Sequence, residues 1–208
     1  AKEADIGDVL VAAEDQEIVD DVKKNGGEAI LTSNNHKTGT DRIYEAFLKL
    51  GRRDIELVMN LQGDEPLMNT KDIQNLNSNM INTKSDLGTL AAKIDDKKVF
   101  ENRNIVKVIT EESLDVSKFP KALNFMRKLD IENNQAYHHL GIYCYNVEVL
   151  KKFVSFKQSQ NEIKNRLEQL RALDNNININ VALAKSSPIG VDTKEDFMAI
   201  KKIMEYKS

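Results

Sequence analysis

Two carboxylates, each in a turn that follows a strand-like run, are the residues best placed to do chemistry. Asp64 stands in Gln-Gly-Asp-Glu-Pro, after an apolar run that ends near Leu61. Asp192 stands in Gly-Val-Asp-Thr, after the apolar run 179–184. Ligands of open α/β sheets bind beyond the carboxyl ends of strands, and Mg²⁺ is usually held by one or two carboxylates together with substrate phosphates. The pattern therefore predicts that Asp64 and Asp192 meet at one sheet edge and hold a metal ion against a phosphate.

The same turns have a simpler interpretation as helix starts. Asp64 or Glu65 could cap a helix that follows Pro66, and Asp192 or Thr193 could be the N-cap of the last helix. A residue can cap a helix and coordinate an ion, so the residues alone leave both interpretations open.

A loop at residues 36–42, His-Lys-Thr-Gly-Thr-Asp-Arg, combines a glycine, hydroxyls and a cation at the start of an expected helix. Free amides at a helix start can meet an anion or a base edge, and Arg42 could reach back toward such a ligand. Ordinary capping by Thr40, with Arg42 in solvent, explains the same residues more simply. Thr38 and Gly39 belong to this candidate site.

The run 138–143, His-His-Leu-Gly-Ile-Tyr, reads as the start of a strand. Because strand side chains alternate, His139 and Gly141 share one face, with Tyr143 following. Adjacent histidines point oppositely, so metal binding by the pair is not expected. His139 is a candidate for one polar contact with a substrate carboxylate or hydroxyl, and the alternative is a histidine without a functional role.

Glu168 and Gln169 lie in Leu-Glu-Gln-Leu-Arg, within an amphipathic segment at residues 161–173. A charged helix face is the default interpretation, although both side chains could hydrogen-bond a polyhydroxylated ligand. The chain has no Ser-His-Asp order, no zinc-ligand spacing and no Gly-x-Gly-x-x-Gly. Nucleophilic hydrolases, zinc enzymes and dinucleotide oxidoreductases therefore lack their central residues here.

The order of expected elements predicts an α/β protein. Strand and helix alternate in the first part, which is the rhythm of a three-layer sandwich with a mostly parallel sheet. The middle has strand-like runs without clear helices between them, which predicts antiparallel additions. We expect one domain over residues 1–208 with an embedded lobe at about 95–160. Expected strands are 9–13, 28–31, the run ending near 61, 87–94, 105–110, 137–145 and 179–184, and expected helices start near 18, 41, 70 and 161.

Composition excludes several classes of protein. The 208 residues carry a formal charge of −3, which does not suggest an electrostatic nucleic-acid binder. The single cysteine, Cys144, lies in an apolar run and fits a buried residue in a reducing cytoplasm. No apolar stretch approaches the roughly 20 residues of a membrane span, and no signal peptide is visible.

Seven motifs together resemble one family. They are Val-Leu-Val-Ala at 9–12, Gly-Gly-Glu at 26–28, Gly-Thr-Asp-Arg at 39–42, Gln-Gly-Asp-Glu-Pro at 62–66, His-Leu-Gly-Ile-Tyr at 139–143, Leu-Glu-Gln-Leu-Arg at 167–171 and Gly-Val-Asp-Thr at 190–193. They occur in family order over nearly the whole chain. The sequence thus resembles the 3-deoxy-manno-octulosonate cytidylyltransferases, also called CMP-Kdo synthetases.

The resemblance implies a nucleotidyltransferase with a Rossmann-like fold. Such an enzyme joins CTP to the sugar acid 3-deoxy-manno-octulosonate (Kdo), giving pyrophosphate and the CMP-Kdo used for lipopolysaccharide synthesis in the cytoplasm. The implied step is attack of the sugar's anomeric hydroxyl on the α-phosphorus of CTP, with Mg²⁺ neutralising charge on the phosphates. A homodimer, formed through the middle lobe, is also implied.

The resemblance also implies residue roles at the matched positions. Asp64 and Asp192 would hold Mg²⁺. The loop with Thr38, Gly39 and Arg42 would read cytosine. The sugar acid or the ribose beside it would be contacted by Gln62, His139, Tyr143, Glu168 and Gln169. Arg127 carries over from a Phe-Ser-Arg segment that reads Phe-Met-Arg here.

The start of the chain departs from the family pattern. The family opens with a strand and a cationic loop that grips the triphosphate, whereas this sequence begins Ala-Lys-Glu-Ala-Asp, without methionine. We therefore expect a truncation and expect the 208-residue chain alone to be inactive. Two alternatives remain, namely a cytidylyltransferase for another acidic sugar, such as a sialic or pseudaminic acid, and a catalytically inactive nucleotide-binding subunit.

Overall fold

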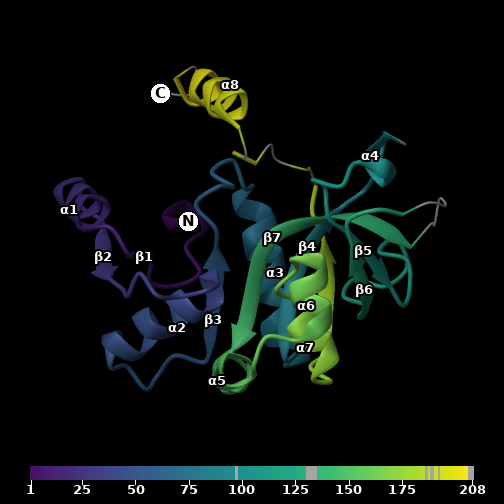
Figure 1. Cartoon of the computed structure of the whole chain (residues 1–208), viewed down its shortest axis with the longest axis horizontal. Coiled ribbons are helices and arrows are strands. Elements are labelled where there is room, and N and C mark those ends of the chain that lie inside the picture. The colour runs from purple at the N-terminus through teal and green to yellow at the C-terminus, as the bar shows by residue number, and fades with distance from the viewer. Residues whose placement is uncertain (97, 130–134, 186, 188–189, 192, 206–208) are drawn as a thin grey trace.

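The computed structural model describes the chain except for residues 97, 130–134, 186, 188–189, 192 and 206–208 (Figure 1). The strands are β1 (Leu10–Ala13), β2 (Glu28–Leu31), β3 (Leu57–Leu61), β4 (Leu87–Ala92), β5 (Lys107–Thr110), β6 (Ala122–Met126), β7 (Ala136–Asn146) and β8 (Ile179–Leu183). The helices are α1 (Gln16–Lys24), α2 (Gly39–Leu50), α3 (Thr70–Thr83), α4 (Lys98–Glu101), α5 (Val147–Ser155), α6 (Gln160–Asn165), α7 (Leu170–Asp174) and α8 (Lys194–Glu205), after a 3₁₀ turn η1 (Lys2–Ala4).

A mixed sheet organises the molecule around the long strand β7. The order is β6-β5-β7-β4-β8, with β3 also paired to β7, while β1 and β2 pair in parallel in a second sheet. Strands β3, β4 and β5 all run antiparallel to β7, and β8 runs parallel to β4. The α/β class is confirmed, and four strands of the large sheet share one direction. The strand expected at 137–145 was interpreted as part of antiparallel additions, and the structure shows it, as β7, antiparallel and in the middle of the sheet.

The burial pattern of β7 explains its central position. Leu140, Ile142 and Cys144 point to one face and pack in the core cluster that contains α3. Tyr143 and Tyr145 point to the other face and pack in the cluster that contains α5 and α7. Because both faces are apolar, the strand is most stable with helices on each side. The embedded lobe expected at about 95–160 contains α4, β5 and β6, which join the sheet through β7.

The sequence predicted one amphipathic helix over 161–173, but the structure has two helices there. It consists of α6 and α7, with Arg166 between them in the left-handed region at φ 53°. Ile163, an apolar residue of this amphipathic segment, is 54% exposed. The break turns the intervening residues toward the sheet, and it lets the buried Glu162 pair with Arg171. The expected elements also omitted α4, β6 and α5.

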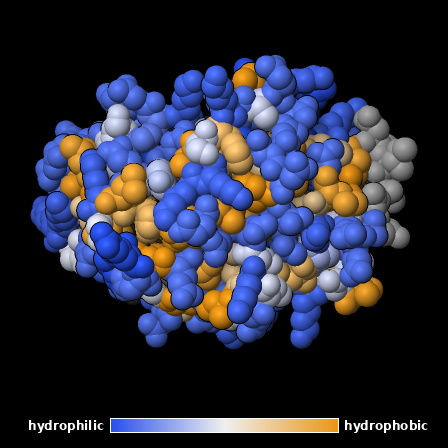
Figure 2. All heavy atoms as spheres, turned by 90° about the horizontal axis from the view of Figure 1, so that it is seen from below, coloured by the Kyte–Doolittle hydropathy of each residue, from blue (hydrophilic) through white to orange (hydrophobic). Residues whose placement is uncertain are grey.

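The face of the molecule in Figure 2 is mainly hydrophilic, with scattered apolar groups. Exposed apolar residues are normal on protein surfaces, because there is not enough polar surface to cover a folded chain. None of the described helices combines the length and the apolar character that crossing a membrane requires.

Gly88 offers a direct test of packing between β4 and α3. A Cβ at this position would lie 2.6 Å from Sδ of Met80. It would also lie 2.9 Å from side-chain carbons of Leu76 and Phe119. We expect Gly88→Ala to lower the free energy of unfolding by about 1–3 kcal/mol, because overpacking displaces core side chains. Urea denaturation measures this, with Gly63→Ala as the control, since a Cβ there meets no atom within 4 Å. Equal stability of the two variants would contradict the packing.

Candidate active site

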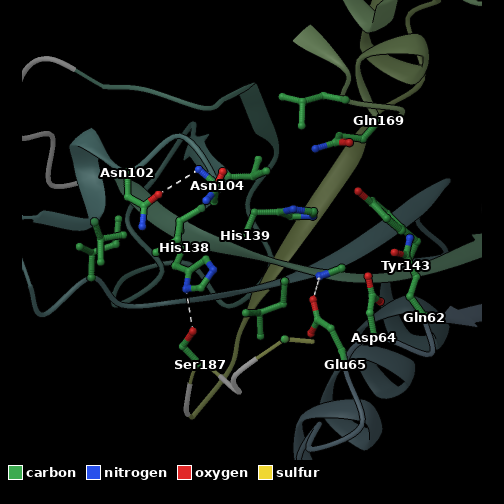
Figure 3. Close-up of a pocket in the computed structure, with 18 of the residues that line it drawn as sticks. Gln62, Asp64, Glu65, Asn102, Asn104, His138, His139, Tyr143, Gln169 and Ser187 are labelled. Atoms are coloured by element: carbon green, nitrogen blue, oxygen red, sulfur yellow. Dashed lines mark hydrogen bonds between the residues drawn. The ribbon is translucent and has the colours of Figure 1, made fainter. Parts of the chain in front are cut away.

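A cavity of about 690 Å³ opens beyond the end of β3 and beside the first half of β7 (Figure 3). Segments that are distant in sequence supply its walls. They are the turn after β3, residues 93–95 and 99 after β4, the segment 102–106 before β5, the first half of β7, the turn between α6 and α7, and residues 187, 190 and 196 after β8. Of the residues predicted for the site, the cavity is lined by Gln62, Asp64, His139, Tyr143, Glu168 and Gln169.

The turn after β3 carries Asp64 into the cavity wall, and it does not begin a helix. The N-cap of α3 is Asn69, whose side chain accepts a hydrogen bond from the Lys71 amide at 2.9 Å. The alternative in which Asp64 or Glu65 caps this helix is therefore wrong. Several residues separate the turn from α3, which leaves the Asp64 side chain available for another function.

The two turns predicted to carry the carboxylate pair do meet. The Val191 amide donates a hydrogen bond to the carbonyl oxygen of Asp64 at 2.8 Å. Asp192 itself lies outside the described residues, so the pair of side chains stays a prediction. The cap alternative holds for Thr193, whose hydroxyl accepts from the Asp196 amide at 3.1 Å while its own amide donates to the Asp196 carboxylate at 2.9 Å.

Glu65 links β7 to the turn after β3 by a hydrogen bond. Its Oε1 accepts a hydrogen bond from the Gly141 amide at 2.6 Å. A side chain at Gly141 would clash with this carboxylate, because a Cβ there would lie 2.7 Å from Oε1. The glycine in the His-Leu-Gly-Ile-Tyr motif thus permits the close approach of β7 and the turn after β3.

His139 is 7% exposed and points into the cavity. Its ring meets the edge of Phe125 at 5.0 Å between centroids and lies 5.5 Å from Tyr143. Burial, followed by the neighbouring His138, lowers the pKa of His139 to about 3. The imidazole is therefore neutral at pH 7 and gives the cavity no positive charge. His139 thus cannot form an ion pair with a substrate carboxylate.

His138 points away from His139, as strand alternation predicted. Its Nδ1 lies 2.6 Å from the Ser187 hydroxyl in the segment after β8 (Figure 3). Within the described part of the chain, no cluster of three or more histidine, cysteine, aspartate or glutamate side chains could hold a metal ion. An ion at Asp64 would therefore need further ligands, and substrate phosphates are the usual ones for Mg²⁺.

Glu168 and Gln169 occupy the turn between α6 and α7. Gln169 is buried and points into the cavity (Figure 3). Burial raises the pKa of Glu168, although the Thr38 and Thr40 hydroxyls and Arg171 favour its charged form. Its Oε1 is buried and has no hydrogen-bond partner among the described residues. A buried acceptor without a partner is costly, so a ligand donor at this position would be stabilising.

The residues of the predicted cytosine loop do not line the cavity, but Thr38 and Thr40 interact with Glu168, which does. Thr38, and not Thr40, caps α2, since its hydroxyl accepts from the Asp41 amide at 3.3 Å. Arg42 is not in solvent as the capping alternative supposed. Its guanidinium donates to the Thr32 hydroxyl at 2.8 Å and pairs with Glu14. Gly39 starts the helix close to the buried amide of Asn60.

Arg127 was predicted to contact the sugar acid, but its hydrogen-bond partners in the structure are backbone carbonyls. Its guanidinium donates to the backbone carbonyls of Asn165 and Arg166 at 2.9 Å and of Arg103 at 3.2 Å. It is absent from the cavity wall, and it joins two segments that form that wall. A direct contact with substrate stays a prediction, because each of the three guanidinium nitrogens donates to a backbone carbonyl here.

Several polar residues of the site were not predicted from the sequence. Asn102 and Asn104 line the cavity, and Thr89 lies beneath it with its hydroxyl 3.0 Å from His139. Thr89 stands in Leu-Gly-Thr-Leu-Ala-Ala, a strand in which all six residues are buried. A polar residue in a fully buried strand was the available signal, since such groups normally need a specific partner.

Comparisons with known proteins agree on one family. Residues 1–179 match the family model described as Cytidylyltransferase. A 3-deoxy-manno-octulosonate cytidylyltransferase from Thermodesulfovibrio yellowstonii is 41% identical over 209 residues, covering 96% of this chain and 82% of the relative. One from Bartonella tribocorum is 38% identical over 206 residues, covering 98% and 84%.

Solved structures agree with the sequence relatives. CMP:2-keto-3-deoxy-manno-octonic acid synthetase complexed with CTP superposes with a TM-score of 0.85 at 30% identity, covering 98% of this chain and 83% of the other. A 4-diphosphocytidyl-2C-methyl-D-erythritol synthase from Anaerococcus prevotii, with a TM-score of 0.62 and 16% identity, shares only the fold. The chain therefore belongs to the 3-deoxy-manno-octulosonate cytidylyltransferase family of nucleotidyltransferases.

Proposed function

We propose that this protein transfers a cytidylyl group from CTP to Kdo, giving CMP-Kdo and pyrophosphate. One observation carries the proposal beyond family membership. Six of the side chains that the family motifs select, from three distant segments, line one cavity. Arrangements of this kind fix a substrate by several weak contacts at once. A dead nucleotide-binding subunit would have no need of the sugar-side residues.

The reaction joins an oxygen to phosphorus and releases pyrophosphate. The anomeric hydroxyl of the sugar attacks the α-phosphorus of CTP, and the bond from that phosphorus to the bridging oxygen of the β-phosphate breaks. Negative charge develops on the phosphate oxygens. Asp64, together with Asp192, would hold Mg²⁺ there, and the ion would neutralise that charge. The chemistry of Asp64 fits this ion, since its carboxylate oxygens line a cavity with room for phosphates.

The sugar side of the cavity offers hydrogen-bonding groups of both kinds. Burial holds the pKa of Tyr143 well above its usual value, so its phenol remains a donor at pH 7. Gln62 and Gln169 supply amides that can both donate and accept. Glu168 supplies a buried acceptor oxygen without a protein partner among the described residues. A sugar acid with several hydroxyls matches this set better than an apolar ligand would.

The nucleotide side involves the loop at Thr38 and Gly39. Exposed amides at the start of α2 are suitable for the cytosine edge. Arg42 would support this loop through Thr32 and Glu14 and would thus act indirectly. The cytoplasmic location, a homodimer and the use of Mg²⁺ belong to the same proposal. The edge strand β6, with Leu123 57% exposed, is a candidate dimer surface that sedimentation of the purified protein would test.

His139→Ala tests the assignment of the two halves of the cavity. Because the imidazole lies on the sugar side, we expect a rise of about tenfold or more in KM for Kdo and little change in CTP affinity. Isothermal titration with CTP and sugar-dependent kinetics measure the two effects. Equal losses for both substrates would remove His139 from the sugar pocket. Turnover of a sialic or pseudaminic acid in preference to Kdo would overturn the choice of sugar.

A further inference from the structure

A bulge in β7 lies directly under the cavity. Thr89 of β4 pairs with Tyr143, but the next residue of β4, Leu90, pairs with Leu140. Gly141 and Ile142 are therefore extra residues on β7 relative to β4, and they interrupt the ladder between these two strands. Bulges of this kind occur beside active sites, where they redirect side chains. The backbone amide and carbonyl groups at the bulge need hydrogen-bond partners other than the β4 backbone.

Two side chains supply these hydrogen bonds. Glu65 accepts from the Gly141 amide on one edge of β7. On the other edge the Thr89 hydroxyl, which is fully buried, lies 2.6 Å from the Ile142 carbonyl oxygen and 3.4 Å from that of Leu140. A carbonyl oxygen can only accept, and a hydroxyl has a single hydrogen. The short contact therefore takes the Thr89 hydrogen.

This arrangement decides the protonation of His139. Its Nε2 lies 3.0 Å from the Thr89 oxygen. Since the hydroxyl hydrogen points to Ile142, that oxygen can only accept, and Nε2 must carry the hydrogen. The ring is neutral, so it has one N–H only. Nδ1 is then left with a lone pair, and no described residue hydrogen-bonds to it.

The Nδ1 lone pair belongs to a ring that is held in place and directed into the cavity. Phe125 and Tyr143 pack against the imidazole, and Figure 3 shows it pointing toward the space that Gln169 also faces. An acceptor at this position attracts a hydroxyl and repels a carboxylate.

We propose that Thr89 is a positioning residue that fixes His139 as the Nε2–H tautomer, so that Nδ1 accepts a hydrogen bond from a hydroxyl group of the sugar acid. The second half rests on the proposed function, whereas the tautomer is a property of the free protein. The role parallels that of groups that orient metal-bound histidines by binding the other ring nitrogen. If Nδ1 accepts this hydrogen bond, a sugar acid that lacks the donating hydroxyl is expected to be a poor substrate.

Nitrogen-15 NMR of the histidine-labelled protein at pH 7 tests the tautomer. The chain has three histidines, and the His139 signals are those lost in His139→Gln. In the unaltered protein we expect a protonated Nε2 and an unprotonated Nδ1. Thr89→Ser should keep this pattern, and Thr89→Val should give a mixture of tautomers. A protonated Nδ1, or a mixture in the unaltered protein, would overturn the proposal even if Thr89→Val does not fold.

Kinetics separate positioning from simple stabilisation of the fold. Thr89→Val should raise KM for Kdo about tenfold, leave CTP affinity unchanged, and be rescued to within about threefold by Thr89→Ser. Thr110→Val is the matched control, because this buried threonine also donates to backbone, at 2.7 Å to the Glu112 carbonyl, but contacts no histidine. Equal losses in the Thr89 and Thr110 valine variants would refute a role through His139. Absence of any turnover with Kdo in the full-length protein would refute the proposed function and leave the tautomer result standing.

Discussion

Asp64→Asn is expected to lower kcat by more than tenfold while the fold stays intact. The turn after β3 places this carboxylate at the cavity and near the segment that leads to Asp192. Asparagine has nearly the same shape but no charge, so it weakens the hold on a divalent cation without creating a void. Electrostatic stabilisation of the phosphates is usually the largest contribution to phosphoryl transfer.

Turnover at several Mg²⁺ concentrations, with melting curves of the same samples, measures this effect. Asp95→Asn is the matched control, since Asp95 also lines the cavity but lies outside the two turns that meet. We expect the control to change kcat less than threefold. Near-normal turnover in a well-folded Asp64→Asn protein would remove Asp64 from the metal site, and an equal loss in Asp95→Asn would indicate a general charge effect.

Arg171→Met should be the most destabilising single change in the site's supporting structure. Arg171 is 2% exposed, and its guanidinium binds both carboxylate oxygens of Glu162, at 2.8 and 2.5 Å. It also lies 4.6 Å over the ring of Phe153 and 3.9 Å from Asp41. Removing one partner of a buried pair leaves the other charge uncompensated, which costs about 3–5 kcal/mol. The turn with Glu168 is expected to loosen as well.

Urea denaturation gives the loss in the free energy of unfolding. The double variant Arg171→Met, Glu162→Leu should recover part of it, because no buried charge then remains. Lys151→Met is the control, since Lys151 pairs with Glu148 at 2.6 Å on the surface and is expected to contribute less than about 1 kcal/mol. A loss in Arg171→Met no larger than in Lys151→Met would contradict the importance of the buried pair.

Local sequence patterns determined most of the elements. The apolar run before Gln-Gly-Asp-Glu-Pro became β3, and the glycine pair at 26–27 follows the end of α1. Alternation along β7 correctly separated His138 from His139. These outcomes depend on periodicity and turn residues, which act between near neighbours. The motifs also identified the family, and six of the candidate residues share one cavity.

Contacts between residues that are distant in sequence determined the features that local patterns could not predict. The sequence predicted one helix over 161–173, but the pairing of Glu162 with Arg171 accompanies a break at Arg166 that turns Glu168 inward. Arg127 has the residue type of a substrate ligand, yet its donors bind backbone carbonyls from distant segments.

His139 shows the same division between what the sequence predicts and what the folded structure determines. The residue itself and its strand face were readable from the sequence. Its neutrality and the tautomer inferred for it depend on burial and on the Thr89 hydroxyl, fifty positions away in the chain. Solvent exclusion and hydrogen-bond direction are set only when strands pair, because no local pattern specifies which side chain a bulge will meet. The sequence thus determined which groups could do the chemistry, and the folded structure decided in which protonation state they meet a substrate.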